Sequence, residues 1–471
     1  MLKHDIDNQH KENIKSDIII EGDRSPMLLA QHTNSINTDT SKTNIVSIDQ
    51  QSYDDHKSTF MNILSAMYAV IFGILFGFLM NKGTVFVSPT IRKQMLFERF
   101  AMLKMFLAAV GVSMLSVALL VLFCGALYGK VLNSYIENNS RRGVLHYIFG
   151  GTLIGLGMVV SGSCPGTVFV QVGSGILNSL FTCLGGLLGT YFYYILIHDR
   201  VSHTKLPPTS LVLRRICDVL HVHSTIIHTI FGCILLGAAI GLEYLIPWKS
   251  DLNSRLLVNG TLNPNEAIGH IFGMAAWPPS ICGAGIGLLQ LFFIFFLEKS
   301  LGVSSAFTVF AAQVCRIKTI GRTIPSMNSF AYGFKNYVTL LFALGAIGGS
   351  ALSSSLSQTI PLGAENGTNI LNSILGGFFL LLGARCAGGC TSGQGISGAE
   401  NGTNILNSIL GGFFLLLGAR CAGGCTSGQG ISGITHLLFG SFLTTACIFG
   451  GGIIFAFTFS LGKDEWSFSN L

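Results

Sequence analysis

Apolar stretches of about 20 residues recur along the chain, and short polar connectors separate them. A helix of that length crosses the hydrocarbon core of a bilayer, which is roughly 30 Å thick. Ten stretches follow this pattern, several of them short or interrupted by glycine: 60–80, 100–128, 145–163, 172–197, 225–247, 278–298, 336–356, 370–387, 405–422 and 433–461. The pattern predicts an all-α polytopic membrane protein with about nine or ten spanning helices and re-entrant half-helices.

Longer polar segments divide these stretches into two pseudo-symmetric halves. Residues 1–57 are rich in Asp, Asn, Ser, Lys and Gln, a composition typical of a disordered tail. A longer connector follows the fourth stretch, and the glycine-interrupted runs on its two sides resemble each other, as in transporters built from two repeats. The predicted organisation is a polar tail at 1–57, a first membrane half at 58–197, a linker at 198–224, a second membrane half at 225–461 and a C-terminal tail at 462–471.

The second half contains an unusual repeat, because residues 364–398 and 399–433 are the same 35 letters written twice. Repeat folds with periods near this length normally use three or more diverged copies, so a solenoid is not expected. Perfect identity fits a recent tandem duplication or an exon or assembly repeat. A second apolar run that truly spanned would reverse the side on which residues 434–471 lie. We therefore expect only one copy at a central site.

Composition narrows the class of protein further. Only 11% of residues are charged, while 58 are glycine, which in an apolar chain indicates close helix packing and broken helices. The formal charge of +6 is spread over loops without a basic stripe or interleaved aromatic residues, so nucleic acid is not an expected partner. No cofactor or catalytic constellation is visible. The expected surroundings are a lipid bilayer, and the compartment stays open.

One cysteine motif lies where an apolar run ends, in Gly162-Ser-Cys164-Pro-Gly166-Thr. Proline lacks an amide hydrogen and has a fixed φ, so it ends the preceding helix and suits the first position of the next. Cys164 would then lie at a helix N-terminus, whose partial positive charge favours a thiolate or an approaching anion. Gly162 and Gly166 would let a ligand approach the backbone closely. The alternative is a buried thiol at a kink.

A second motif occurs in each copy of the duplicated block. An arginine inside an apolar run costs about 2.5 to 3.5 kcal/mol on insertion scales, so it usually faces a cavity, a partner or a substrate. This arginine indicates an anion, although it could instead cap carbonyls where the helix breaks. The candidate residues are Arg385, Cys386, Gly388 and Cys390 in the first copy and Arg420, Cys421, Gly423 and Cys425 in the second.

The Cys-x-x-x-Cys pairs leave two other readings open. Structural zinc sites space their paired ligands differently, and the duplication supplies half of the set, so no metal is expected. A redox pair of Cys386 and Cys390 would need the helix to break before the two sulfurs could bond.

Glycine and proline also interrupt the segment at 81–92, Asn-Lys-Gly-Thr-Val-Phe-Val-Ser-Pro-Thr-Ile-Arg, directly after the first span. Such interruptions are typical of a re-entrant or half-helix segment. The segment at 277–287, Trp-Pro-Pro-Ser-Ile-Cys-Gly-Ala-Gly-Ile-Gly, is its candidate mirror in the second half.

The two cysteine motifs, taken with GFLMNKGTVFVSPTIRKQM at 77–95, resemble the YeeE/YedE sulfur-transport family over roughly residues 60–460. The resemblance implies glycine-rich half-helices that enter from both sides and meet near the membrane centre, with three functional cysteines along an hourglass path. Cys164 matches the cysteine of the first half, and Cys390, or its copy Cys425, matches that of the second. The remaining family cysteine aligns with Phe86.

The expected function is therefore transport of a small inorganic sulfur anion, with thiosulfate as the leading substrate and no enzymatic activity. Cysteine thiols and half-helix N-termini would pass the anion through a central constriction. A soluble sulfur-handling partner stays open. The alternatives are a membrane thiol-disulfide oxidoreductase, which would need a quinone or similar acceptor, and a transporter of another sulfur or selenium species or of a soft metal.

Overall fold

The computed structural model describes residues 40–140, 143–176, 178–196, 210, 213–249, 271–299, 304–317, 321–322, 324–357 and 426–461. These residues form helices and turns, with no strand apart from one isolated bridge between Arg215 and Leu438. Six of the helices are long and apolar enough to span a membrane: Phe60–Lys82, Ala101–Glu137, Ser224–Leu245, Pro279–Leu297, Asn336–Leu356 and Phe439–Thr458. The prediction of an all-α polytopic membrane protein is therefore confirmed.

The first half of the chain alternates long helices with short ones. Its elements are α2 (Thr40–Lys82), α3 (Ser88–Met95), α4 (Ala101–Asn139), α5 (Val144–Ser161), α6 (Pro165–Gly173) and α7 (Asn178–Leu196). Helix α2 begins inside the segment predicted to be a polar tail. A turn at 83–87 separates α2 from α3, and the left-handed Thr84 (φ 56°) lies in it. The interrupted segment at 81–92 is thus a break followed by a short helix, as its glycine and proline predicted.

The described part of the second half begins at the linker. Its elements are α9 (Ile216–Leu220), α10 (Ser224–Leu245), η3 (Ile271–Gly273), α11 (Pro279–Leu297), α12 (Ser304–Val314), η4 (Pro325–Met327), α14 (Asn328–Ala331), α15 (Phe334–Leu356), η6 (Thr426–Gly433) and α18 (Phe439–Leu461). The candidate mirror at 277–287 differs from the prediction, because Pro279 starts the full span α11 rather than a short half-helix. Proline suits the first turn of a helix of any length.

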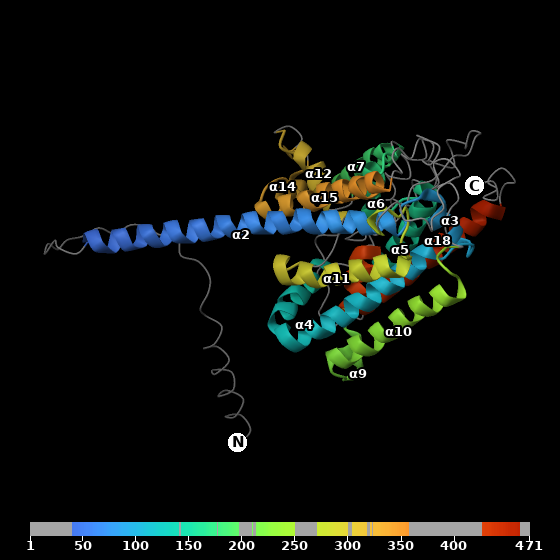
Figure 1. Cartoon of the computed structure of the whole chain (residues 1–471). Helices are drawn as coiled ribbons and strands as arrows, with labels where there is room; N and C mark the ends of the chain where they lie inside the picture. The colour runs from blue at the N-terminus through green and yellow to red at the C-terminus, as the bar shows by residue number, and fades with distance from the viewer. Residues whose placement is uncertain are drawn as a thin grey trace, which may run out of the picture. The chain divides into compact units, whose positions relative to one another are not determined.

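Glycines let helices of the two halves approach closely. Helix α4 lies between α10 and α11 (Figure 1). A β-carbon added at Gly283 of α11 would lie 2.1 Å from the carbonyl oxygen of Met105 in α4. One added at Gly77 of α2 would lie 2.0 Å from the carbonyl oxygen of Ala346 in α15. Each glycine belongs to a Gly-x-x-x-Gly pair, so both pairs pack a helix of one half against a helix of the other.

Candidate functional site

Cys164 lies at the sharp break between α5 and α6. Helix α5 ends at Ser161, and Gly162 follows in the left-handed region (φ 54°), which glycine adopts without steric cost. Cys164 is the extended residue just before α6 (φ −123°, ψ 157°), and Pro165 is the first residue of that helix. Its side chain is fully buried. The proline therefore places this thiol at a helix N-terminus, as predicted.

Hydrogen bonds of two serines hold the loop before Cys164. The Ser161 hydroxyl donates to the carbonyl oxygen of Gly157 (2.7 Å) and accepts from the backbone N–H of Ser163 (3.1 Å). The Ser163 hydroxyl donates to Oε1 of Gln171, a residue of α6 (3.3 Å). All three polar side chains are fully buried. Buried polar groups that satisfy one another in this way fix the loop in one conformation.

Gln171 also connects this loop to the break after α2. Its amide Nε2 donates to the carbonyl oxygen of Phe86 at 3.0 Å. Phe86 is almost fully buried, and it occupies the position of the missing family cysteine. The structure thus brings two of the three family positions, those of Cys164 and Phe86, next to one side chain. Sequence reasoning did not identify Gln171, although a single polar residue inside the apolar α6 was a usable signal.

A second buried polar cluster joins the end of α2 to α6 and α15. Nδ2 of Asn81 lies 2.8 Å from the hydroxyl oxygens of both Ser174 and Ser354 and 3.1 Å from that of Ser350. The Ser353 hydroxyl donates to Oδ1 of Asn81 at 2.7 Å. These five residues are almost fully buried. The cluster fixes the C-terminal end of α6, the half-helix that begins at Cys164.

The second cysteine motif lies outside the described residues in both copies. This concerns Arg385, Cys386, Gly388, Cys390, Arg420, Cys421, Gly423 and Cys425. Gly166 is described and is the second residue of α6. The described residues hold no group of three or more His, Cys, Asp or Glu side chains that could bind a metal ion.

The end of the second copy is described, and it is packed into the protein. Helix η6 begins at Thr426, one residue after Cys425. Gln429 accepts a hydrogen bond from the Ser441 hydroxyl of α18, and the Ser432 hydroxyl donates to Oε1 of Gln290 in α11 (3.3 Å). The exit of the second copy is therefore anchored to two spanning helices.

Two comparisons with known proteins agree with this arrangement. The Sulphur transport family matches residues 82–403 and again residues 399–454, so its second match begins where the second copy begins. The thiosulfate transporter TsuA of Escherichia coli (strain K12) is 25% identical over 345 residues, which cover 72% of this chain and 87% of that protein.

The family match extends over far more than half of the chain and includes the break after α2 and the Cys164 motif. Six apolar helices of spanning length accompany it, as a multi-pass membrane transporter requires. The family is one of transporters, which agrees with the prediction that the chain is not an enzyme. The chain belongs to the sulphur transport family, as its resemblance to YeeE/YedE proteins predicted.

Proposed function

We propose that this protein carries thiosulfate across its membrane and that Cys164 contacts the anion on its way. The observation that carries the proposal is the position of the buried Cys164 thiol at the N-terminus of α6. Family membership supports sulfur transport, and the named relative transports thiosulfate. The glycine at 162 supports close approach of an anion to the backbone, because no side chain covers it.

Two weak attractions act together at this point. The N-terminus of a helix contributes on the order of 0.3 to 2 kcal/mol toward a nearby anion. The Cys164 S–H group is a weak donor, able to bond the terminal sulfur of thiosulfate without a covalent step. Contacts of this strength suit conduction, which requires binding tight enough for entry and loose enough for release.

The second half would supply the other cysteine contact. We assign it to Cys425 with Arg420, because the anchored helix η6 follows Cys425 directly. The first copy, with Cys390 and Arg385, would lie away from the centre. Cys386 and Cys421 precede the central cysteines by one helical turn and are the candidates to replace the cysteine missing at Phe86.

Uptake of labelled thiosulfate into vesicles tests the proposal. We expect the Cys164→Ala variant to lose about 90% or more of the wild-type uptake, because removing one contact that acts at the constriction costs on the order of 1.4 kcal/mol. Cys183→Ala is the matched control, since that thiol is half-buried in α7, and its uptake should stay near wild type. Undiminished uptake in Cys164→Ala would contradict the relay. Copper- or quinone-dependent activity would favour a metal transporter or an oxidoreductase.

Deleting one copy of the duplicated block is a separate prediction. The copies are identical and adjacent, so deleting 364–398 or 399–433 yields the same protein of 436 residues (471 − 35). We expect this shortened chain to retain uptake, because only one copy occupies the central site. In the full-length chain, Cys425→Ala should then lower uptake strongly and Cys390→Ala should not. A shortened chain that folds but no longer transports would show that both copies are needed.

A further inference from the structure

Lys82 is a fully buried cation at the end of the first span. Its ammonium donates to the carbonyl oxygens of Met274 (2.6 Å) and Ser353 (3.4 Å) and lies 5.5 Å from the centre of the Phe78 ring. Within the part of the chain that the structure describes, no carboxylate lies within 4.0 Å of it. Neutral carbonyls and a ring leave the charge uncompensated, which is costly within a membrane and usually marks a functional site.

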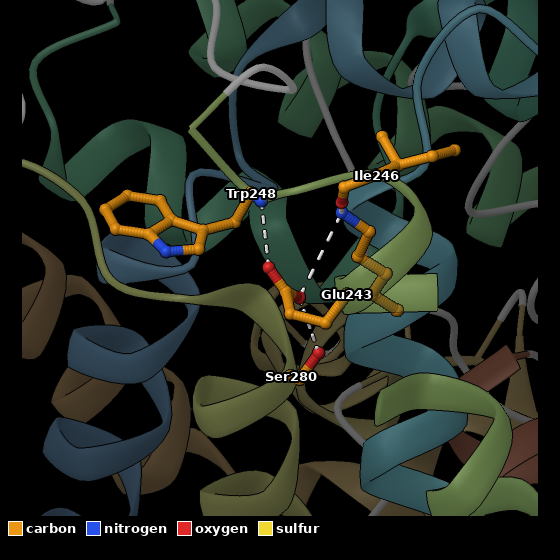
Figure 2. Close-up of polar contacts among 5 residues, drawn as sticks. Glu243, Ile246, Trp248 and Ser280 are labelled. Atoms are coloured by element: carbon orange, nitrogen blue, oxygen red, sulfur yellow. Dashed lines mark hydrogen bonds and ion pairs between the residues drawn. The ribbon is translucent and has the colours of Figure 1, made fainter. Parts of the chain in front are cut away.

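Lys104 provides a contrast, because it is equally buried but has an acidic partner. Its ammonium lies 4.0 Å from the carboxylate of Glu243 and donates to the carbonyl oxygen of Ile246. Figure 2 shows that Glu243 in turn accepts from the backbone N–H of Trp248 and from the Ser280 hydroxyl, both at 2.9 Å. This pair is a satisfied structural unit, so burial of a lysine in this fold does not by itself require an anion.

The segment at 271–277 covers Lys82 with aromatic residues. The backbone N–H of Trp277 donates to the carbonyl oxygen of Lys82 at 2.8 Å. The rings of Phe272 and Trp277 lie 6.2 and 5.7 Å from that of Phe78, the ring that faces the ammonium. The Met274 carbonyl that accepts from Lys82 belongs to the same segment. An anion that takes the place of this carbonyl would reach the ammonium directly.

Cys282 adds a thiol beside the same lysine. It is fully buried in the first turn of α11, the end of that helix that carries partial positive charge. A β-carbon added at Gly83, the residue after Lys82, would lie 3.2 Å from the Cys282 β-carbon. The two side chains are also close enough for their charges to interact. A buried cation, a thiol and a helix N-terminus therefore meet where α2 ends and α11 begins.

We propose that Lys82, Cys282 and the first turn of α11 form a binding site for a sulfur-containing divalent oxyanion at one end of the spans. The proposal rests on the proposed function and places a second station on the path of the same anion, apart from Cys164. Lys82 would bind the oxygens through its charge, and the Cys282 thiol would contact the terminal sulfur. The lysine thus supplies affinity for any oxyanion of this charge, and the thiol supplies preference for sulfur over oxygen.

Equilibrium binding and vesicle uptake of labelled thiosulfate, each with sulfate as competitor, separate these two roles. Lys82→Met should weaken binding of both anions by about tenfold or more, because a charged contact is lost. Lys82→Arg keeps the charge and should retain most of the binding. Cys282→Ser should lower the preference for thiosulfate over sulfate by roughly threefold, the size of one weak hydrogen bond, without changing sulfate binding.

The double variant Lys104→Met/Glu243→Gln is the matched control, because it removes a buried lysine together with its acid and should bind as wild type does. Should Lys82→Met fail to fold, Lys82→Arg and Cys282→Ser carry the test. Unchanged binding in Lys82→Met, or an unchanged anion preference in Cys282→Ser, would overturn the site.

Failure of the site and failure of the proposed function give different results. Loss of uptake in Cys164→Ala with normal uptake and binding in Lys82→Met would reject only the site. Absence of thiosulfate uptake by the wild type, with Lys82-dependent binding of the anion, would reject thiosulfate transport and retain the site.

Discussion

Replacing Gly349 by alanine is expected to destabilise the protein by roughly 3 kcal/mol or more, because the new methyl group has no space. An added β-carbon would lie 2.0 Å from the carbonyl oxygen of Ile74 and 2.7 Å from its α-carbon. Both atoms belong to the backbone of α2, so no side-chain rotation relieves the clash. Helices α2 and α15 would have to separate. Thermal unfolding in detergent should show a midpoint lower by roughly 5 °C or more.

Gly348, the preceding residue of α15, is the matched control. A β-carbon there meets nothing within 4 Å. Alanine has a higher helix propensity than glycine by about 1 kcal/mol, so Gly348→Ala should leave stability unchanged or raise it slightly. Equal effects of the two substitutions would show that α2 and α15 are not packed through Gly349.

Replacing Asn81 by alanine is expected to cost roughly 3 kcal/mol and to reduce transport as well. The substitution leaves several buried hydroxyl groups short of a partner, and each unsatisfied group costs about 1 to 3 kcal/mol. Ser174 and Ser350 lie 2.8 Å apart and can still bond each other, which limits the loss. Transport should fall because Ser174 directly follows α6, so the half-helix that begins at Cys164 loses its anchor.

The control for this prediction is Asn62→Ala, on the same helix but at a half-buried position. It should change the midpoint of thermal unfolding by less than about 2 °C, in keeping with substitutions outside buried networks. A thermal midpoint for Asn81→Ala as high as that of Asn62→Ala would mean that the serines do not depend on Asn81. Comparison of uptake at equal amounts of folded protein separates the effect on α6 from the effect on stability.

Local patterns predicted the spans and one helix start, because both depend on neighbouring residues. Stretches of apolar residues located α10, α11 and α15 within a few residues, and Pro165 located the start of α6. Spacing along the chain could not indicate that Gln171 bonds the carbonyl of Phe86, since these residues are far apart in sequence. The same holds for Asn81 and its serines, whose partners belong to three helices.

The role of Lys82 was hidden for a similar reason. In the sequence it reads as an ordinary basic residue at the end of a span, where a long side chain commonly reaches the membrane surface. Only the packing of the segment at 271–277 over it reveals that the charge is enclosed. The two prolines before α11 were read as part of a short half-helix, whereas the long apolar run behind them continues as a full span.

The bond from Gln171 to residue 86 has a consequence for how this family can vary. Gln171 grips the backbone carbonyl, which every amino acid possesses, and makes no demand on the side chain at that position. Replacement of cysteine by phenylalanine therefore alters the chemistry of the passage without loosening its frame. The same bond makes the turn at 83–87 and the loop before Cys164 a single mechanical unit, so that neither can open while the other stays shut.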